Sequence, residues 1–446
     1  MQKSDNFFVK NKSIVTFLVL EVVALTSFNF GNVSHIFGVA GAIIALFGAV
    51  FLVFTNEDKR SMLFFLIPLG LLLILSSWGA LNEFSKGFSL FSNISLIVSL
   101  PAFLALGFIL RKLNDVKTKT VLLVVGGALA LITLFGLFST IIEYGFFYRL
   151  IYKNTPNYYY DGIPYNVTKE MYWLTGFSFS EVYVEYGSLF AVLTASFFPG
   201  LLFISPKTDR NDFIVCAAIG GIGLLTLLVL PDFKALIVLA AVSLFGVIYK
   251  FLKNNKKVVK TIGFCFICLL GLALLFFVVS IINAGIGYKF GGVLNKLFAQ
   301  NGIMNNVTPV YDALFTKVGG RLVNFFGLTP SVINESVTWL ETGFFEVQLL
   351  KEIGFIGTIL FAEFLILMGY VLFNYLKSSE DKDEYKTIFV VMLLAFFVYE
   401  SLFYRVSIAP HEESYSAFLR SPLLLVMLFI FGYVFTIPAK KEEEHE

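Results

Sequence analysis

Apolar runs of about 20 residues recur along the whole chain and are separated by mostly short polar segments. Each run is long enough to cross the roughly 30 Å hydrocarbon core of a bilayer as an α-helix. The 446 residues are 57% hydrophobic and only 14% charged, which is more apolar surface than a soluble protein of this length could bury. A β-barrel would instead show alternating segments of about 10 residues. The pattern predicts an all-α polytopic membrane protein, with residues 1–446 in a single integral membrane domain.

We expect about twelve membrane spans. They lie near 12–30, 34–54, 61–81, 89–110, 119–144, 181–204, 212–230, 233–252, 258–283, 344–376, 384–406 and 417–438. The span near 212–230 contains the glycine-rich run IGGIGLL, and small residues in membrane helices favour close helix packing.

The distribution of basic residues predicts the orientation of these spans. Most Lys and Arg residues fall in the N-terminal segment, the C-terminal tail and alternate short loops such as YKFLKNNKKVVK. Short loops rich in Lys and Arg stay in the cytoplasm, so both termini are predicted to be cytoplasmic. Three longer loops, 145–180, 285–343 and 407–416, are then external. The loop 285–343, between the ninth and tenth spans, is the longest segment that a membrane would not accept.

Two basic residues on the predicted external side are candidates for binding phosphate. Lys234 lies at the outer end of the eighth span after a very short loop, where its ammonium could hold a phosphate of a lipid-linked donor. The alternative is a lysine that extends to ordinary lipid headgroups. Arg321 follows two glycines in VGGRLVNFFG, and a guanidinium binds phosphate oxygens bidentately. Alternatively, Arg321 pairs with Asp312 or Glu335.

Candidates for proton transfer lie at the same predicted side. Glu341 precedes the tenth span and could accept a proton from a sugar hydroxyl, or simply cap the helix. Glu181 and Glu185, spaced i,i+4 at the outer start of the sixth span, share one helix face. They suit acid–base chemistry or cation binding, or only the helix dipole. His411 lies near Arg405 in a charge-rich loop and is a candidate base, although such a loop can also be plain solvated surface.

Other chemistries lack their motifs. The sequence contains no Walker A motif, no HExxH motif and no dinucleotide fingerprint. No run of charges follows the middle of the spans, as an ion or proton pathway usually requires, which counts against a secondary transporter. Loop 145–180 is crowded with tyrosines, and such aromatic side chains suit sugar rings and the membrane interface equally well.

Taken together, these features resemble the O-antigen polymerase and O-antigen ligase superfamily of bacterial envelope glycosyltransferases. The resemblance is carried by the span count with its large external loop, and by four short motifs. These motifs are FKAL (233–236), GRL (320–322), ETGFFEVQLLKEIGFIGTILF, which enters the tenth span, and TGFSFSEVYVEYGSLFA, which opens the sixth. Ligases of the superfamily usually carry a His at the entry to the tenth span. This chain has Glu341-Thr342-Gly343 there, which favours a polymerase.

The resemblance implies a GT-C-like fold and metal-independent glycosyl transfer, without a cofactor, at the outer face of the bacterial cytoplasmic membrane. Donor and acceptor would be undecaprenyl-pyrophosphate-linked glycans, in contact with membrane lipids, with a chain-length regulator as a further partner and no nucleic acid. Lys234, Arg321 and Arg405 would neutralise the pyrophosphate, and Glu341, Glu181 or His411 would deprotonate the acceptor hydroxyl. The alternatives are a ligase that moves the glycan to another acceptor, and a flippase or transporter of lipid-linked sugars.

Overall fold

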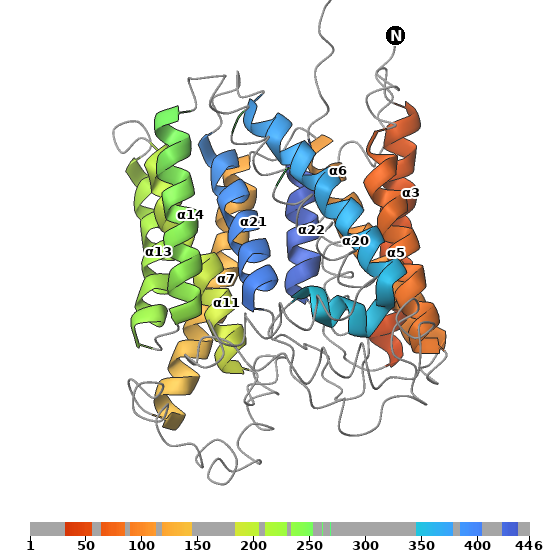
Figure 1. Ribbon diagram of the computed structural model, residues 1–446, viewed down its shortest axis with the longest axis horizontal. Helices are drawn as coiled ribbons and strands as arrows, with labels where there is room; N and C mark the ends of the chain where they lie inside the picture. Colours follow the sequence, from red (N-terminus) through yellow and green to blue (C-terminus); the bar gives the residue numbers. More distant parts are fainter. Residues whose placement is uncertain are drawn as a thin grey trace, which may run out of the picture. The chain divides into compact units, whose positions relative to one another are not determined.

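The computed structural model describes residues 32–55, 64–84, 90–112, 118–144, 183–204, 210–229, 233–252, 345–377, 384–403 and 422–435, together with positions 261 and 268. Apart from a few turn and bend residues, these segments are helical, and no strand occurs among them (Figure 1). The chain divides into two compact units. Unit 1 comprises residues 1–117, 359–383 and 422–446, and unit 2 comprises residues 118–358 and 384–421.

Within the described segments, three helices are long and apolar enough to cross a membrane: Asn93–Arg111, Thr118–Phe138 and Arg210–Val229. Shorter apolar helical stretches accompany them in both units. Large hydrophobic side chains point outward from these helices; Phe47 is 72% exposed and Phe251 is 77% exposed. Outward-facing apolar side chains at this density are typical of helices surrounded by lipid. The fold is therefore that of a membrane-embedded helical protein.

Most of the predicted spans coincide with described helices. The span expected near 12–30 lies outside the described residues, as does the span near 258–283 apart from positions 261 and 268. The three loops predicted to be external also lie outside them. The closest agreement is for the span expected at 233–252, which is helix α14 (Phe233–Leu252). The span expected at 181–204 is divided into α11 (Tyr183–Ala195), α12 (Phe197–Gly200) and the 3-10 turn η1 (Leu201–Phe203).

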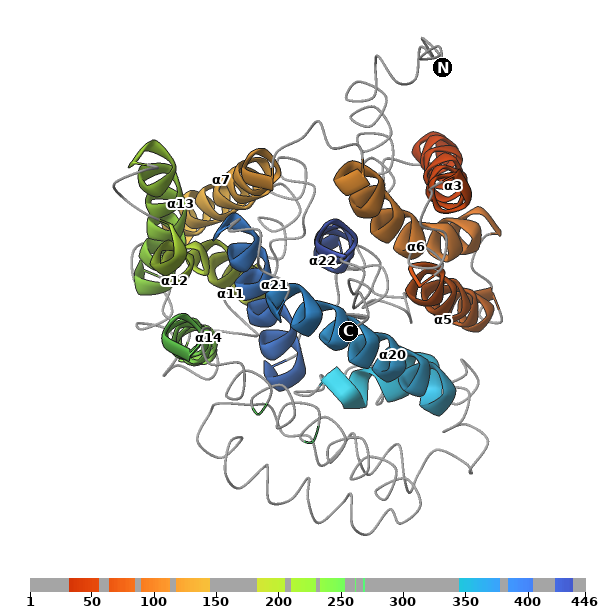
Figure 2. The same ribbon diagram turned by 90° about the horizontal axis from the view of Figure 1, so that it is seen from above.

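In unit 1, helix α6 (Leu90–Lys112) packs against α3 (Asn32–Thr55), α5 (Leu66–Phe84) and α22 (Pro422–Val434) (Figure 2). The crossing of α6 with α22 depends on one glycine in each helix. A Cβ atom at Gly107 would overlap the carbonyl oxygen of Phe429, and one at Gly432 would overlap the carbonyl oxygen of Leu104. Small residues at such a crossing let two backbones come into direct contact, which is how membrane helices gain packing energy.

Helix α6 also carries a proline, and a neighbouring helix compensates for it. Pro101 lies inside α6 and has no N–H to donate to the carbonyl of Ile97, four residues earlier. The Ser76 hydroxyl of α5 donates to that carbonyl oxygen at 2.8 Å. Ser76 is fully buried and its one proton is also within reach of the Leu72 carbonyl at 2.7 Å. In a membrane, a free backbone carbonyl needs such a partner because no water is available.

In unit 2, helix α13 (Arg210–Val229) packs closely against α11, and α7 (Thr118–Tyr144) packs against both (Figure 2). A Cβ atom at Gly223 of α13 would overlap the backbone of Ala195 and lie 2.6 Å from the carbonyl oxygen of Ala191. The prediction that the glycine-rich run favours close packing is therefore confirmed. Helix α11 is further joined to α7 by the buried hydroxyls of Thr133 and Thr194, which lie 2.9 Å apart.

Candidate functional site

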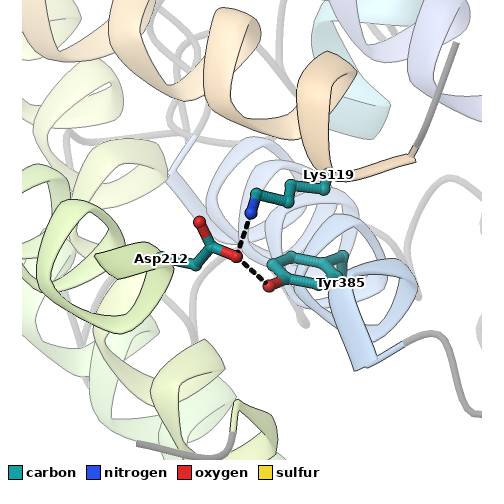
Figure 3. A network of polar contacts seen from close by, with 3 residues as sticks. All are labelled: Lys119, Asp212 and Tyr385. Carbon is teal, nitrogen blue, oxygen red and sulfur yellow. Dashed lines mark hydrogen bonds and ion pairs between the residues drawn. The ribbon is translucent and has the colours of Figure 1, made fainter. Parts of the chain in front are cut away.

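A buried carboxylate joins three helices of unit 2. Asp212 of α13 is only 6% exposed, and it forms an ion pair with Lys119 of α7. The hydroxyl of Tyr385, in α21 (Glu384–Phe403), donates a hydrogen bond to the same carboxylate oxygen at 2.6 Å. Figure 3 shows the two donors approaching Asp212 from separate helices. One oxygen atom therefore holds α7, α13 and α21 together.

The position of this cluster follows from where the three helices begin. Helix α7 starts at Thr118, α13 at Arg210 and α21 at Glu384, so Lys119, Asp212 and Tyr385 each lie in a first turn. The partial positive charge at a helix N-terminus stabilises an acidic side chain in the first turn, which favours Asp212 at this place. A carboxylate buried at the edge of an apolar helix still needs a hydrogen-bonding partner and a counter-charge, and Tyr385 and Lys119 supply them.

The contacts of this cluster serve to hold helices together. The Lys119 side chain is 42% exposed, so its charge is screened by solvent and adds little to stability by itself. The hydrogen bond from Tyr385 is the more buried contact, and it fixes the start of α21 against the start of α13. Among the described residues, no group of three or more His, Cys, Asp or Glu side chains could hold a metal ion. The contacts of Lys119 and Tyr385 with Asp212 give the cluster a role in helix assembly.

The residues predicted to form a catalytic site are only partly covered by the structure. Lys234 lies in the first turn of α14, as the sequence predicts for the start of the eighth span. The other predicted site residues lie outside the described residues: Glu181, Arg321, Glu341, Arg405 and His411. Whether Lys234 meets any of them therefore stays a prediction.

The helix ends place Lys234 far from the Asp212 cluster. Helix α13 runs from Arg210 to Val229, and α14 begins at Phe233 after only three intervening residues. The start of α14 therefore adjoins the end of α13, about 30 Å along the helix axis from its start. Lys234 thus lies at one end of the helices and the buried carboxylate at the other.

The far end of α14 carries a second lysine with a structural contact. The Lys250 ammonium, in the last turn of α14, donates to the carbonyl oxygen of Leu202 in η1 at 2.6 Å. Carbonyls at the end of a helix lack intrahelical partners, and a cation is a favourable donor to them. The two lysines of α14 therefore occupy opposite ends of one helix, and Lys250 is engaged by the fold.

Sequence reasoning did not single out the Asp212 cluster. Asp212 stands in the short segment PKTDRND at the start of an apolar run, which locates it at a helix end. Its partners are far away in the chain, Lys119 in an earlier span and Tyr385 in a later one, and no local pattern links them. No family model, curated protein or solved structure matches the chain.

Proposed function

We propose that the protein is a polysaccharide polymerase that joins lipid-linked oligosaccharide repeat units at the outer face of the bacterial cytoplasmic membrane. The observation that carries this proposal is the position of Lys234. It lies in the first turn of a membrane helix, three residues after the preceding helix ends, and at the end of the helices opposite the Asp212 cluster. The resemblance of FKAL (233–236) and of the segment around Arg321 to O-antigen polymerases supports the same assignment.

The reaction requires a cation close to the membrane surface. In the proposed transfer, an acceptor hydroxyl attacks the anomeric carbon of the donor sugar, the bond to the pyrophosphate breaks, and the polyprenyl pyrophosphate leaves with the negative charge. Preorganised positive charge that meets this developing charge commonly contributes more to the rate enhancement than any other effect. Lys234 stands in the first turn of its helix, and a cation at such a position suits a phosphate at the membrane surface whose prenyl chain stays in lipid.

The remaining roles rest on the resemblance. Arg321 and Arg405 would share the pyrophosphate charge with Lys234, and Glu341, Glu181 or His411 would accept the proton of the acceptor hydroxyl. The predicted orientation, with both termini cytoplasmic, puts Lys234 on the external side.

The test is elongation by the purified full-length protein in detergent, supplied with lipid-linked repeat units and read as a ladder of longer lipid-linked glycans. Lys234→Ala and Arg321→Ala should abolish the ladder, while Lys250→Ala, at the other end of the same helix, should retain it. Normal elongation by both site variants would show that the pyrophosphate site is assigned wrongly. The absence of any ladder with the wild-type protein would count against a polymerase.

A transport role is the second candidate, and one observation favours it. Glu363 is exposed within the apolar part of helix α20 (Phe345–Lys377), although the sequence has no run of mid-span charges. The detergent experiment separates the two roles, because elongation without a sealed membrane excludes a transport-only protein. A ligase would instead transfer the glycan once to an unrelated acceptor and give no ladder.

A further inference from the structure

Glu363 lies deep in an otherwise apolar helix. Helix α20 (Figure 1) contains the apolar stretch Ile356–Leu372, and Glu363 is near the middle of that stretch. The nearest charged positions in the helix are Glu352 and Lys377, roughly 16 Å and 21 Å away along its axis at 1.5 Å per residue. The carboxyl group is therefore close to the centre of any bilayer that α20 crosses.

The Glu363 side chain points away from the packed face of α20. That face consists of Phe361, Phe364, Met368 and Val371, which are at most 1% exposed. Glu363 is exposed, and so are Ile366 at 42% and Tyr370 at 45%, on the other side of the helix. Within the described residues, Glu363 has no hydrogen bond or ion pair. A mid-membrane carboxyl that faces outward needs a polar environment from another source.

Polar positions recur on the same stripe of α20. Tyr370 follows Glu363 by seven residues, and positions 352 and 374, a Glu and an Asn, lie eleven residues to either side. Seven residues are about two turns and eleven residues about three turns, so all four positions share one helix face. This second observation does not depend on the exposure of Glu363. A polar line along a membrane helix is typical of a face that meets water rather than lipid.

The cost of placing a charge in lipid favours water around the Glu363 side chain. A charged side chain at the centre of a lipid-facing helix is costly, and such residues usually face a water-filled cavity or a partner. Nothing on the packed face of α20 offsets this cost for Glu363. Hydration of the outward face would offset it.

We propose that the face of α20 carrying Glu363 and Tyr370 lines a water-filled path within the membrane that admits small cations. The negative charge of Glu363 favours cations over anions in this path. The proposal is independent of glycan polymerisation, because it concerns only the hydration of one helix face.

The test is the accessibility of a single cysteine at Ile366, the exposed position next to Glu363 on this stripe. The native Cys216, Cys265 and Cys268 are replaced by Ala in the full-length protein, which is then placed in lipid vesicles. Ile366→Cys is treated with a cationic and an anionic methanethiosulfonate. Leu131→Cys, in the middle of α7 and 58% exposed, is the matched control. Because these reagents react with the thiolate, which forms in water, Ile366→Cys should react at least about tenfold faster than Leu131→Cys.

A separate substitution tests the preference for cations. Ile366→Cys should react faster with the cationic reagent than with the anionic one, and Glu363→Gln should remove this preference while keeping the reaction. Equal rates for Ile366→Cys and Leu131→Cys, whether both slow or both fast, would overturn the hydrated path. A preference that persists in Glu363→Gln would overturn the role of Glu363. Neither result bears on the glycan ladder, so failure here is distinct from failure of the polymerase proposal.

Discussion

The Ser76 hydroxyl of α5 donates to the carbonyl oxygen of Ile97 in α6, which Pro101 leaves without its usual helical partner. A proline would otherwise leave this carbonyl unsatisfied in the apolar interior. Helices α5 and α6 are thus joined where Pro101 interrupts the backbone hydrogen bonds of α6. This contact explains how α6, the helix that α3, α5 and α22 all contact, accommodates a proline.

Loss of the Ser76 hydroxyl should destabilise unit 1 in a way that depends on Pro101. Ser76→Ala should cost about 1 kcal/mol of unfolding free energy, which is within the range measured for hydrogen bonds between membrane helices. In a Pro101→Ala background the new backbone N–H takes over the Ile97 carbonyl, so Ser76→Ala should cost less. Equilibrium unfolding in mixed micelles of increasing dodecyl sulfate gives the four free energies. An equal cost in both backgrounds would contradict the compensation.

The glycines of α13 should differ sharply in their tolerance of a methyl group. Gly223→Ala forces a Cβ into the backbone of α11 and should cost about 1–3 kcal/mol, the usual range for overpacking. Gly221, two residues earlier, has no atom within 4 Å of the added Cβ. Gly221→Ala should therefore be neutral, or stabilising by up to about 1 kcal/mol because Ala favours helix.

The two variants, Gly223→Ala and Gly221→Ala, are compared by thermal unfolding and by the monodispersity of the detergent-purified proteins. If both variants unfold alike, the close approach of α11 and α13 is not a determinant of stability.

The hydrogen bond between Tyr385 and Asp212 should carry more stability than the ion pair beside it. Tyr385→Phe should lower the unfolding free energy by about 1 kcal/mol, since it removes a donor to a buried carboxylate. Lys119→Met should have a smaller effect because Lys119 is partly exposed. In an Asp212→Ala background, Tyr385→Phe should cost less. An undiminished cost there would show that Tyr385 acts through other contacts.

Lys234 should affect the chemical step of the proposed reaction. Removal of one preorganised electrostatic donor typically lowers kcat by about 10²- to 10³-fold, and Lys234→Gln should fall in this range. Lys234→Arg keeps the charge and should retain a measurable rate. Initial rates of elongation over a range of donor concentrations separate kcat from KM. A rise in KM with unchanged kcat would mean that Lys234 only anchors the donor lipid.

The sequence predicts individual candidate residues, but it does not predict which of them lie together. The sequence predicts that Lys234 lies at the start of a span, directly after a short loop, and α14 begins at Phe233. The Asp212 cluster is not recognisable in this way, because its members stand at the starts of three separate runs. A local pattern reports on the residues within one helix, and a contact between helices depends on how those helices are packed.

The sequence by itself determined the helical, membrane-embedded class and the bounds of helices such as α14, because an apolar run in lipid must satisfy its backbone hydrogen bonds internally. It also predicted that the glycines of α13 would allow close packing. Only the tertiary structure decided which helices meet: α6 with α22 through Gly107 and Gly432, α5 with α6 through Ser76, and α7, α13 and α21 through Asp212. In lipid, apolar helix surfaces gain no hydrophobic energy by meeting one another, so the pairing depends on a few small or polar residues whose partners are distant in the chain.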